Sequence, residues 1–76
     1  MIKKLDHFKI GEKGIIVKVD GEGRVRRRLF DMGVTPNADV MMIKKAPLGD
    51  PIEIKIRGYL LTLRKEEAAL VSLEVE

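Results

Sequence analysis

The sequence predicts a small, mainly β barrel of about five short strands, with one helix inserted after the first strand. Three observations support this fold class. Short apolar segments alternate with polar residues at period two, as strands do; glycines and prolines separate these segments; and one segment has apolar residues at helical spacing instead. The chain has 76 residues, the length of one domain, so residues 1–76 are expected to form a single unit.

Five segments carry the strand pattern. The clearest begins at Ile52, where isoleucines alternate with charged residues up to Arg57. In the first segment, Ile15, Val17 and Val19 share one face. The predicted strands are residues 15–19, 40–45, 52–57, 60–64 and 71–76. Short helical turns are expected over residues 5–10 and 66–70.

A hairpin is expected where Gly58 and Tyr59 separate two of these strands. Because glycine is favoured at the first position of a type II′ turn, these two residues are predicted to form the turn. The resulting register pairs Ile54 with Leu63 and keeps every inward pair apolar. A slip by one residue would set Ile54 against a polar side chain, which a barrel core would not tolerate.

The predicted helix covers residues 23–32, where apolar residues recur at helical spacing. On a helix of about 3.6 residues per turn, Val25, Leu29 and Met32 would face the core and Arg27 would face solvent. Gly33 then provides a natural C-terminal stop.

The residue types of the chain give little support for an enzyme or a metal-binding protein. There is no cysteine, and His7 is the only histidine, with Asp6 and Glu12 as its nearest carboxylates. One histidine makes a poor site for a transition metal, so His7 is expected to be a surface residue and no metal or cofactor is expected. No nucleophile or zinc motif occurs, and Glu66 and Glu67 are expected to be solvated, so the chain is predicted not to be an enzyme.

The basic residues gather in one place. The net charge is +3, from 15 basic and 12 acidic residues, which is a mild excess. The dense cluster comprises Arg24, Arg26, Arg27 and Arg28. Such a cluster has two interpretations. It is a solvated charged face of the helix, or it is a docking patch, because arginine beside a half-exposed aromatic is favoured at interfaces. The candidate partner-binding residues are Arg26, Arg27 and Phe30 on the helix and Leu48 and Asp50 in a loop.

A longer motif lies in the same region. The segment Arg27–Pro36 resembles the RRL-x-D-[LM]-G-x-x-P signature of the FeoA family, and further similarity occurs at Pro47–Pro51, Arg57-Gly58 and Leu63-Arg64. Asn37 departs from the family, where glycine is usual. The resemblance implies an SH3-like barrel and a small cytoplasmic protein of ferrous iron uptake, which supports or regulates the FeoB membrane transporter. It also extends to the domain that ends the iron-dependent repressors.

Two functions therefore stay open. The first is a non-enzymatic accessory protein that docks on the cytosolic region of a FeoB-type transporter and has no small-molecule substrate. The second is a nucleic-acid-associated or repressor-type SH3-like domain. The start at Met1, the lack of a helix-turn-helix and the few aromatic residues favour the first over nucleic acid. No signal peptide or membrane span is expected, which places the protein in the cytoplasm.

Overall fold

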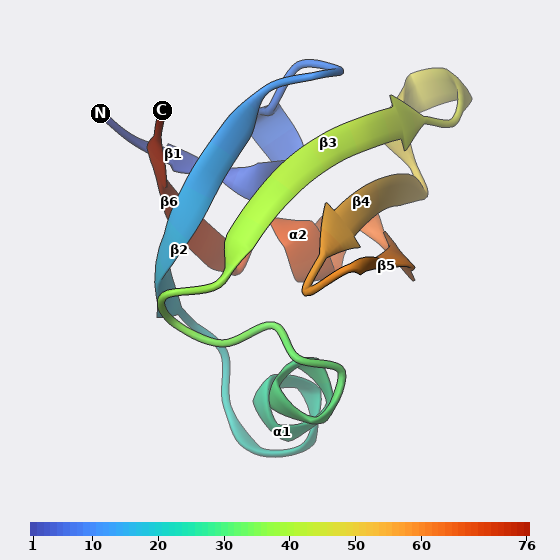
Figure 1. Cartoon of the computed structure of the whole chain (residues 1–76). Helices are drawn as coiled ribbons and strands as arrows, with labels where there is room; N and C mark the ends of the chain where they lie inside the picture. The colour runs from blue at the N-terminus through green and yellow to red at the C-terminus, as the bar shows by residue number, and fades with distance from the viewer.

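Six antiparallel strands form one curved sheet in the computed structural model, which describes all 76 residues. Neighbouring strands follow the order β1-β6-β2-β3-β4-β5 and curl around a common interior (Figure 1). The strands are β1 Ile2–Lys4, β2 Lys13–Val19, β3 Asp39–Lys45, β4 Ile52–Ile56, β5 Tyr59–Leu63 and β6 Val71–Val75. The helices are α1 Gly23–Asp31 and α2 Lys65–Ala68, with 3-10 turns at Leu5–His7 and Pro47–Gly49.

A single apolar cluster of 16 buried residues fills the interior. Strand β4 contributes Ile52, Ile54 and Ile56, which alternate with outward charged residues as the period-two pattern predicts. Both helices are too short and too polar to span a bilayer.

The five predicted strands and the predicted helix are all present. The structure adds one strand, β1, so that α1 follows the second strand rather than the first. Strand β1 has only three residues, two of them lysines, and therefore carries no alternating pattern. It becomes a strand by pairing with β6, a partner at the far end of the chain.

The prediction that Ile15, Val17 and Val19 share one face is wrong for β2. Ile16 is buried, whereas Ile15 and Val17 are exposed. The pairing of β2 with β6 shifts between Ile16 and Lys18, which marks a β-bulge. A bulge adds one residue to one strand, so the inward face passes from Ile16 to Val19 without keeping period two.

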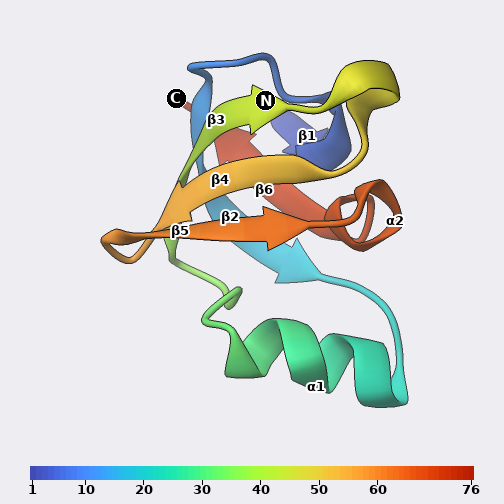
Figure 2. The same cartoon turned by 90° about the vertical axis from the view of Figure 1, so that its right-hand side faces the viewer.

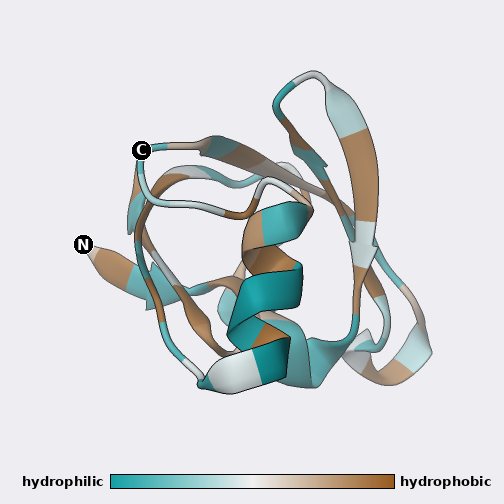
Figure 3. Ribbon diagram, turned by 90° about the horizontal axis from the view of Figure 1, so that it is seen from below, coloured by the Kyte–Doolittle hydropathy of each residue, from teal (hydrophilic) through white to brown (hydrophobic).

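Helix α1 crosses the lower end of the barrel, as the views from the side and from below show (Figures 2 and 3). Leu29 is fully buried in the core, as predicted, and Met32 packs against it. Val25 does not reach the core and is 45% exposed. The first turn of α1 lies beside α2 instead of over the barrel opening, so Val25 lines a surface depression with Glu67 and Leu70.

The predicted hairpin register is wrong by two residues. The turn is Arg57-Gly58, with φ values of 49° and 81°, as a type I′ turn requires. Ile54 therefore pairs with Leu61, and Ile56 with Tyr59. A shift of two residues leaves every side chain on its original face, so the apolar pattern could not distinguish the two registers.

The tip of this hairpin binds the C-terminal end of α1. The Arg57 side chain donates from Nε to the Gly33 carbonyl oxygen at 3.0 Å and from Nη2 to the Thr35 hydroxyl. The Tyr59 hydroxyl donates to the Met32 carbonyl oxygen. The bonds to Met32 and Gly33 satisfy carbonyl groups at and just beyond the end of the helix. All three bonds join the end of α1 to the hairpin.

Leu29→Ala is expected to lower the free energy of unfolding by about 2–5 kcal/mol, because it removes buried apolar surface and leaves a cavity. Urea unfolding measures the change. Val25→Ala, on the same helix, is the control and should cost far less. Equal losses for the two variants would show that Leu29 does not close the core.

Gly33→Ala is expected to destabilise the fold by about 1 kcal/mol more than Gly11→Ala. Both glycines have a left-handed backbone, with φ of 91° and 87°. A Cβ at Gly33 would lie 3.0 Å from the Tyr59 hydroxyl oxygen and 3.2 Å from Arg57 Cδ, whereas one at Gly11 meets nothing. Melting curves of both variants compare the two costs, and similar values would contradict the role of the hairpin tip.

Candidate protein-docking surface

Helix α1 presents its basic residues outward because one leucine anchors it. Arginine is a good helix former, so the run from Arg24 to Arg28 supports the helix. Leu29 is the buried residue of the nine in α1, and the helix stops where Gly33 adopts a left-handed backbone and its N–H bonds the Phe30 carbonyl. The outward side of α1 is predominantly hydrophilic (Figure 3).

Arg26 and Phe30 form a fixed pair on this helix. They are one turn apart, and the Arg26 guanidinium carbon lies 4.4 Å from the centroid of the Phe30 ring. Arg26 Nε also donates to the Val19 carbonyl oxygen at 3.1 Å. A cation over an aromatic face is stabilised by about 0.5–1 kcal/mol at an exposed site, so this pair forms a surface that is part apolar and part cationic.

Arg28 has a structural role. Its guanidinium forms an ion pair with Glu67 of α2. The Glu67 carboxylate also accepts a bond from the Arg64 backbone N–H at 2.9 Å, as a glutamate does at the third position of a helical turn. The prediction that Glu66 and Glu67 are both solvated is therefore wrong for Glu67, which is 6% exposed. Its charge is buried because Arg28 neutralises it.

Arg27 remains free for a partner. It is exposed and forms no ion pair or hydrogen bond within the chain. A shallow surface depression brings it together with Arg26, Phe30 and Asp31. The structure thus unites three of the predicted partner-binding residues, Arg26, Arg27 and Phe30, in one place, which we call the α1 patch.

Leu48 and Asp50 lie elsewhere. Their loop is at the opposite end of the barrel from α1 (Figures 1 and 2). Leu48 is 97% exposed and has a φ of 67°. The Asp50 carboxylate accepts bonds from Arg64 Nε at 3.1 Å, Arg64 Nη2 at 3.0 Å and the Lys65 backbone N–H at 3.0 Å. Asp50 therefore anchors the loop, and Leu48 is the side chain that the loop presents to solvent.

The pKa of Asp50 reflects these bonds. The hydrogen bond from Arg64, followed by that from the Lys65 backbone, holds the pKa of the carboxyl below its ordinary value of 3.8. The same contact raises the pKa of the Arg64 guanidinium. Both shifts favour the charged forms, as expected for an ion pair.

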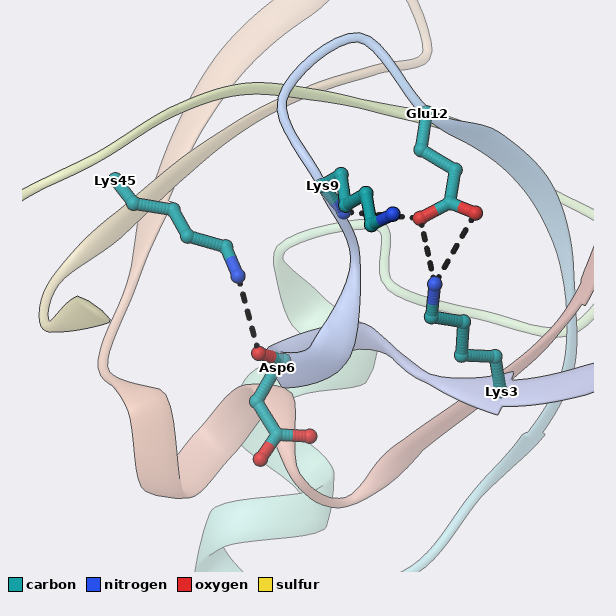
Figure 4. Close-up of polar contacts among 5 residues, drawn as sticks. All are labelled: Lys3, Asp6, Lys9, Glu12 and Lys45. Atoms are coloured by element: carbon teal, nitrogen blue, oxygen red, sulfur yellow. Dashed lines mark hydrogen bonds and ion pairs between the residues drawn. The ribbon is translucent and has the colours of Figure 1, made fainter.

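The neighbourhood of His7 does not assemble a metal site. His7 is exposed, and its Nε2 lies 3.7 Å from Asp6 Oδ2. Lys3 Nζ binds the Glu12 carboxylate at 2.9 and 3.1 Å, and the Lys9 backbone N–H binds it at 2.9 Å, while the Asp6 carboxylate points away from it (Figure 4). The hydrogen bond from Lys3 lowers the pKa of Glu12. The chain has no group of three histidine or carboxylate side chains that could hold an ion.

Two features of this surface were not predicted. The burial of Glu67 had no clear sequence signal, because Arg64 at the start of α2 is not a residue that usually caps a helix. The contact of Arg57 and Tyr59 with the end of α1 had none, since it joins residues separated by 22 to 27 positions.

Comparison with known proteins establishes the family. The FeoA domain model matches residues 3–75. The chain belongs to the FeoA family. FeoA domains are non-catalytic accessory domains of ferrous iron transport, so the prediction that the chain is not an enzyme is confirmed. The predicted SH3-like fold is confirmed as well.

One FeoA relative is a fusion. The Fe(2+) transport protein A/Fe(2+) transporter FeoB fusion protein of Porphyromonas gingivalis (strain ATCC BAA-308 / W83) is 33% identical over 72 residues. The match covers 95% of this chain and 8% of the fusion, so the chain spans a small part of that relative.

Solved structures show the same fold. The crystal structure of an iron uptake regulatory protein (FeoA) is 30% identical, with a TM-score of 0.92 and 100% coverage of both chains. The Stenotrophomonas maltophilia FeoA complexed with zinc, described as a procaryotic SH3 domain protein, is 23% identical, with a TM-score of 0.79 over 97% of this chain and 89% of that one. A manganese-dependent transcriptional repressor shares the fold alone, at 12% identity and a TM-score of 0.90 over 99% of this chain and 42% of the repressor.

Asp50→Asn is expected to lower stability at neutral pH and to lose this effect in acid. Because folding depresses the pKa of Asp50, its carboxylate stabilises the fold above the unfolded pKa, and the contribution disappears as the pH falls through the folded pKa. The stability difference between wild type and variant should therefore be constant above about pH 5 and shrink below about pH 4. Urea unfolding at several pH values measures it, and a difference that stays constant in acid would contradict the ion pair.

Proposed function

We propose that this FeoA-family protein is a cytoplasmic accessory protein of ferrous iron uptake that binds the cytosolic region of a FeoB-type transporter through the α1 patch. The proposal rests mainly on the contact between Arg26 and Phe30 beside the free Arg27. Arginine and aromatic residues are enriched at the energetic centres of protein interfaces. Contacts with Phe30 and the Val19 carbonyl restrict the Arg26 side chain, which lowers the side-chain entropy lost on binding.

The transporter is a suitable partner because a relative carries both components in one chain. In the Porphyromonas gingivalis fusion, Fe(2+) transport protein A and the FeoB transporter are linked. Linkage raises the effective concentration of one component near the other. The fusion therefore supports the FeoB transporter as the partner of a FeoA domain.

Leu48 is a second contact in this proposal. A fully exposed leucine on a loop held by the Asp50–Arg64 ion pair suits insertion into an apolar pocket of the partner. Asp50 contributes by holding the loop. Since the loop and the α1 patch lie at opposite ends of the barrel, a partner that touches both must enclose the domain or contact it with two segments.

Nucleic acid is a less suitable partner. Two of the four clustered arginines already have partners within the protein. Arg26 contacts Phe30 and the Val19 carbonyl, and Arg28 forms an ion pair with Glu67. The chain has three aromatic residues in total, of which Phe8 is fully buried and Phe30 is covered by Arg26. Neither a continuous cationic face nor a row of stacking platforms is present.

The double variant Arg27→Ala/Phe30→Ala tests the α1 patch. It is expected to stay folded with some loss of stability, because Phe30 packs against the core from outside and Arg27 is exposed. It is also expected to lose binding to the purified cytosolic region of the transporter. Pull-down or calorimetry measures binding. The matched control is Arg24→Ala, an exposed arginine outside the depression that holds Arg27 and Phe30. Normal binding by a folded double variant would rule out the α1 patch.

A further inference from the structure

Strand β5 ends the sheet, with β4 as its one neighbour. In a hairpin with a two-residue turn, the pair that flanks the turn exchanges both backbone bonds, and the next pair exchanges none. Tyr59 and Leu61 therefore bond β4 through their pairs Ile56 and Ile54. The N–H and C=O groups of the alternate residues, Leu60 and Thr62, point away from the sheet. No turn or loop backbone bond uses them.

The two edges of the sheet are protected differently. Strand β1, at the other edge, has three residues, and its lysines are held in ion pairs, Lys3 with Glu12 and Lys4 with Asp20. Short length and lysines are the usual means by which proteins keep an edge from pairing with another chain. Strand β5 has five residues, Tyr-Leu-Leu-Thr-Leu, with no charge and no proline, and its pairing has no bulge. Strand β5 therefore lacks the charges, proline and bulge that protect an edge against pairing.

The surroundings of this edge are cationic. Helix α1 lies across from β5 (Figures 1 and 2) and is tied to it by the bond from Tyr59 to Met32. Two of its arginines, Arg24 and Arg27, form no side-chain bond within the chain, and Asp31 is its one carboxylate. In the β4–β5 hairpin, Lys55 is opposite Leu60 and forms no ion pair, and Glu53, opposite Thr62, is the hairpin's one carboxylate. Leu60 itself is 58% exposed.

We propose that the β5 edge accepts an extended acidic segment of a partner as an additional strand. The unpaired backbone groups of Leu60 and Thr62 suit a strand rather than a helix, since only an extended chain presents its own groups at matching spacing. Apolar side chains of the segment would pack on Leu60, and its carboxylates would face Lys55, which lies opposite Leu60. This proposal rests on the proposed function, because it takes the segment to belong to the cytosolic part of the transporter.

The test uses overlapping synthetic peptides that cover the cytosolic segments of the transporter. An acidic, partly apolar peptide is expected to bind, with slowed amide hydrogen exchange at Leu60 and Thr62 as the NMR signature. Thr62→Pro removes the outward N–H without removing a bond to β4, and edge strands tolerate proline. It should weaken peptide binding by about tenfold or more, whereas the matched control Thr62→Val keeps the N–H and should bind as wild type.

A second pair of variants covers the case in which Thr62→Pro does not fold. Leu60→Glu places a negative charge on the edge, and Leu60→Lys places a positive one. The glutamate variant should bind the acidic peptide at least several times more weakly than the lysine variant, and added salt should reduce the difference. Equal binding by the two, or equal binding by the proline and valine variants, would overturn the proposal.

The two proposals fail in different ways. If no peptide protects Leu60 and Thr62 while the intact cytosolic region still binds, the β5 edge is excluded and the α1 patch stands. If a peptide protects the edge and the Arg27→Ala/Phe30→Ala variant binds the intact region normally, the α1 patch is excluded and the β5 edge stands. If neither the peptides nor the intact region bind, both the β5 edge and the docking function are excluded.

Discussion

The attachment of α1 to the open lower end of the barrel is the interaction on which the rest of the structure depends. Leu29 inserts into the core from below, and two further contacts hold the helix at its sides. The Arg57 and Tyr59 side chains bind the carbonyl groups at its C-terminal end, and Arg28 pairs with Glu67 of α2. A domain of this size has a thin core, so a helix that closes one end of it contributes to stability and also determines which residues face outward.

This attachment divides four neighbouring arginines into two groups. Arg26 and Arg28 point to the sides of the helix, where each finds a partner in the protein, and Arg27 points away from the barrel. The arginines that bind within the protein hold the helix and the Phe30 ring in place, while Arg27 stays available. The same helix closes one end of the barrel and exposes its other side to solvent. A surface held in place by the core loses less entropy on binding a partner.

The α1 patch and the β5 edge are related by the same geometry. The bond from Tyr59 to the end of α1 joins the last strand of the sheet to the helix, so the two surfaces belong to neighbouring elements of one end of the barrel. Both are surrounded by cations, and charge complementarity mainly accelerates and orients association. The Leu48 loop is at the other end, where the Asp50–Arg64 ion pair gives it a fixed position of its own.

Local patterns in the sequence determined the element types. Alternation at period two identified five of the six strands, helical spacing identified α1, and glycine and proline marked the turns. Ile52, Ile54 and Ile56 were assigned to the core from alternation alone, because a strand with one buried face must place every second residue inward. Helical spacing also predicted that Arg26, Arg27 and Phe30 lie close together, since they fall within about one turn of α1.

Tertiary structure decided what depends on residues far apart in the chain. The bulge in β2 and the existence of β1 both follow from pairing with β6. The apolar pattern did not determine the hairpin register, because a shift of two residues keeps every side chain on its face. In the observed register the turn is Arg57-Gly58, and the Arg57 and Tyr59 side chains reach the end of α1. Glu67 is buried where it forms an ion pair with Arg28 of α1. Periodicity reports which side of an element is apolar, and it carries no information about which distant group will meet that side.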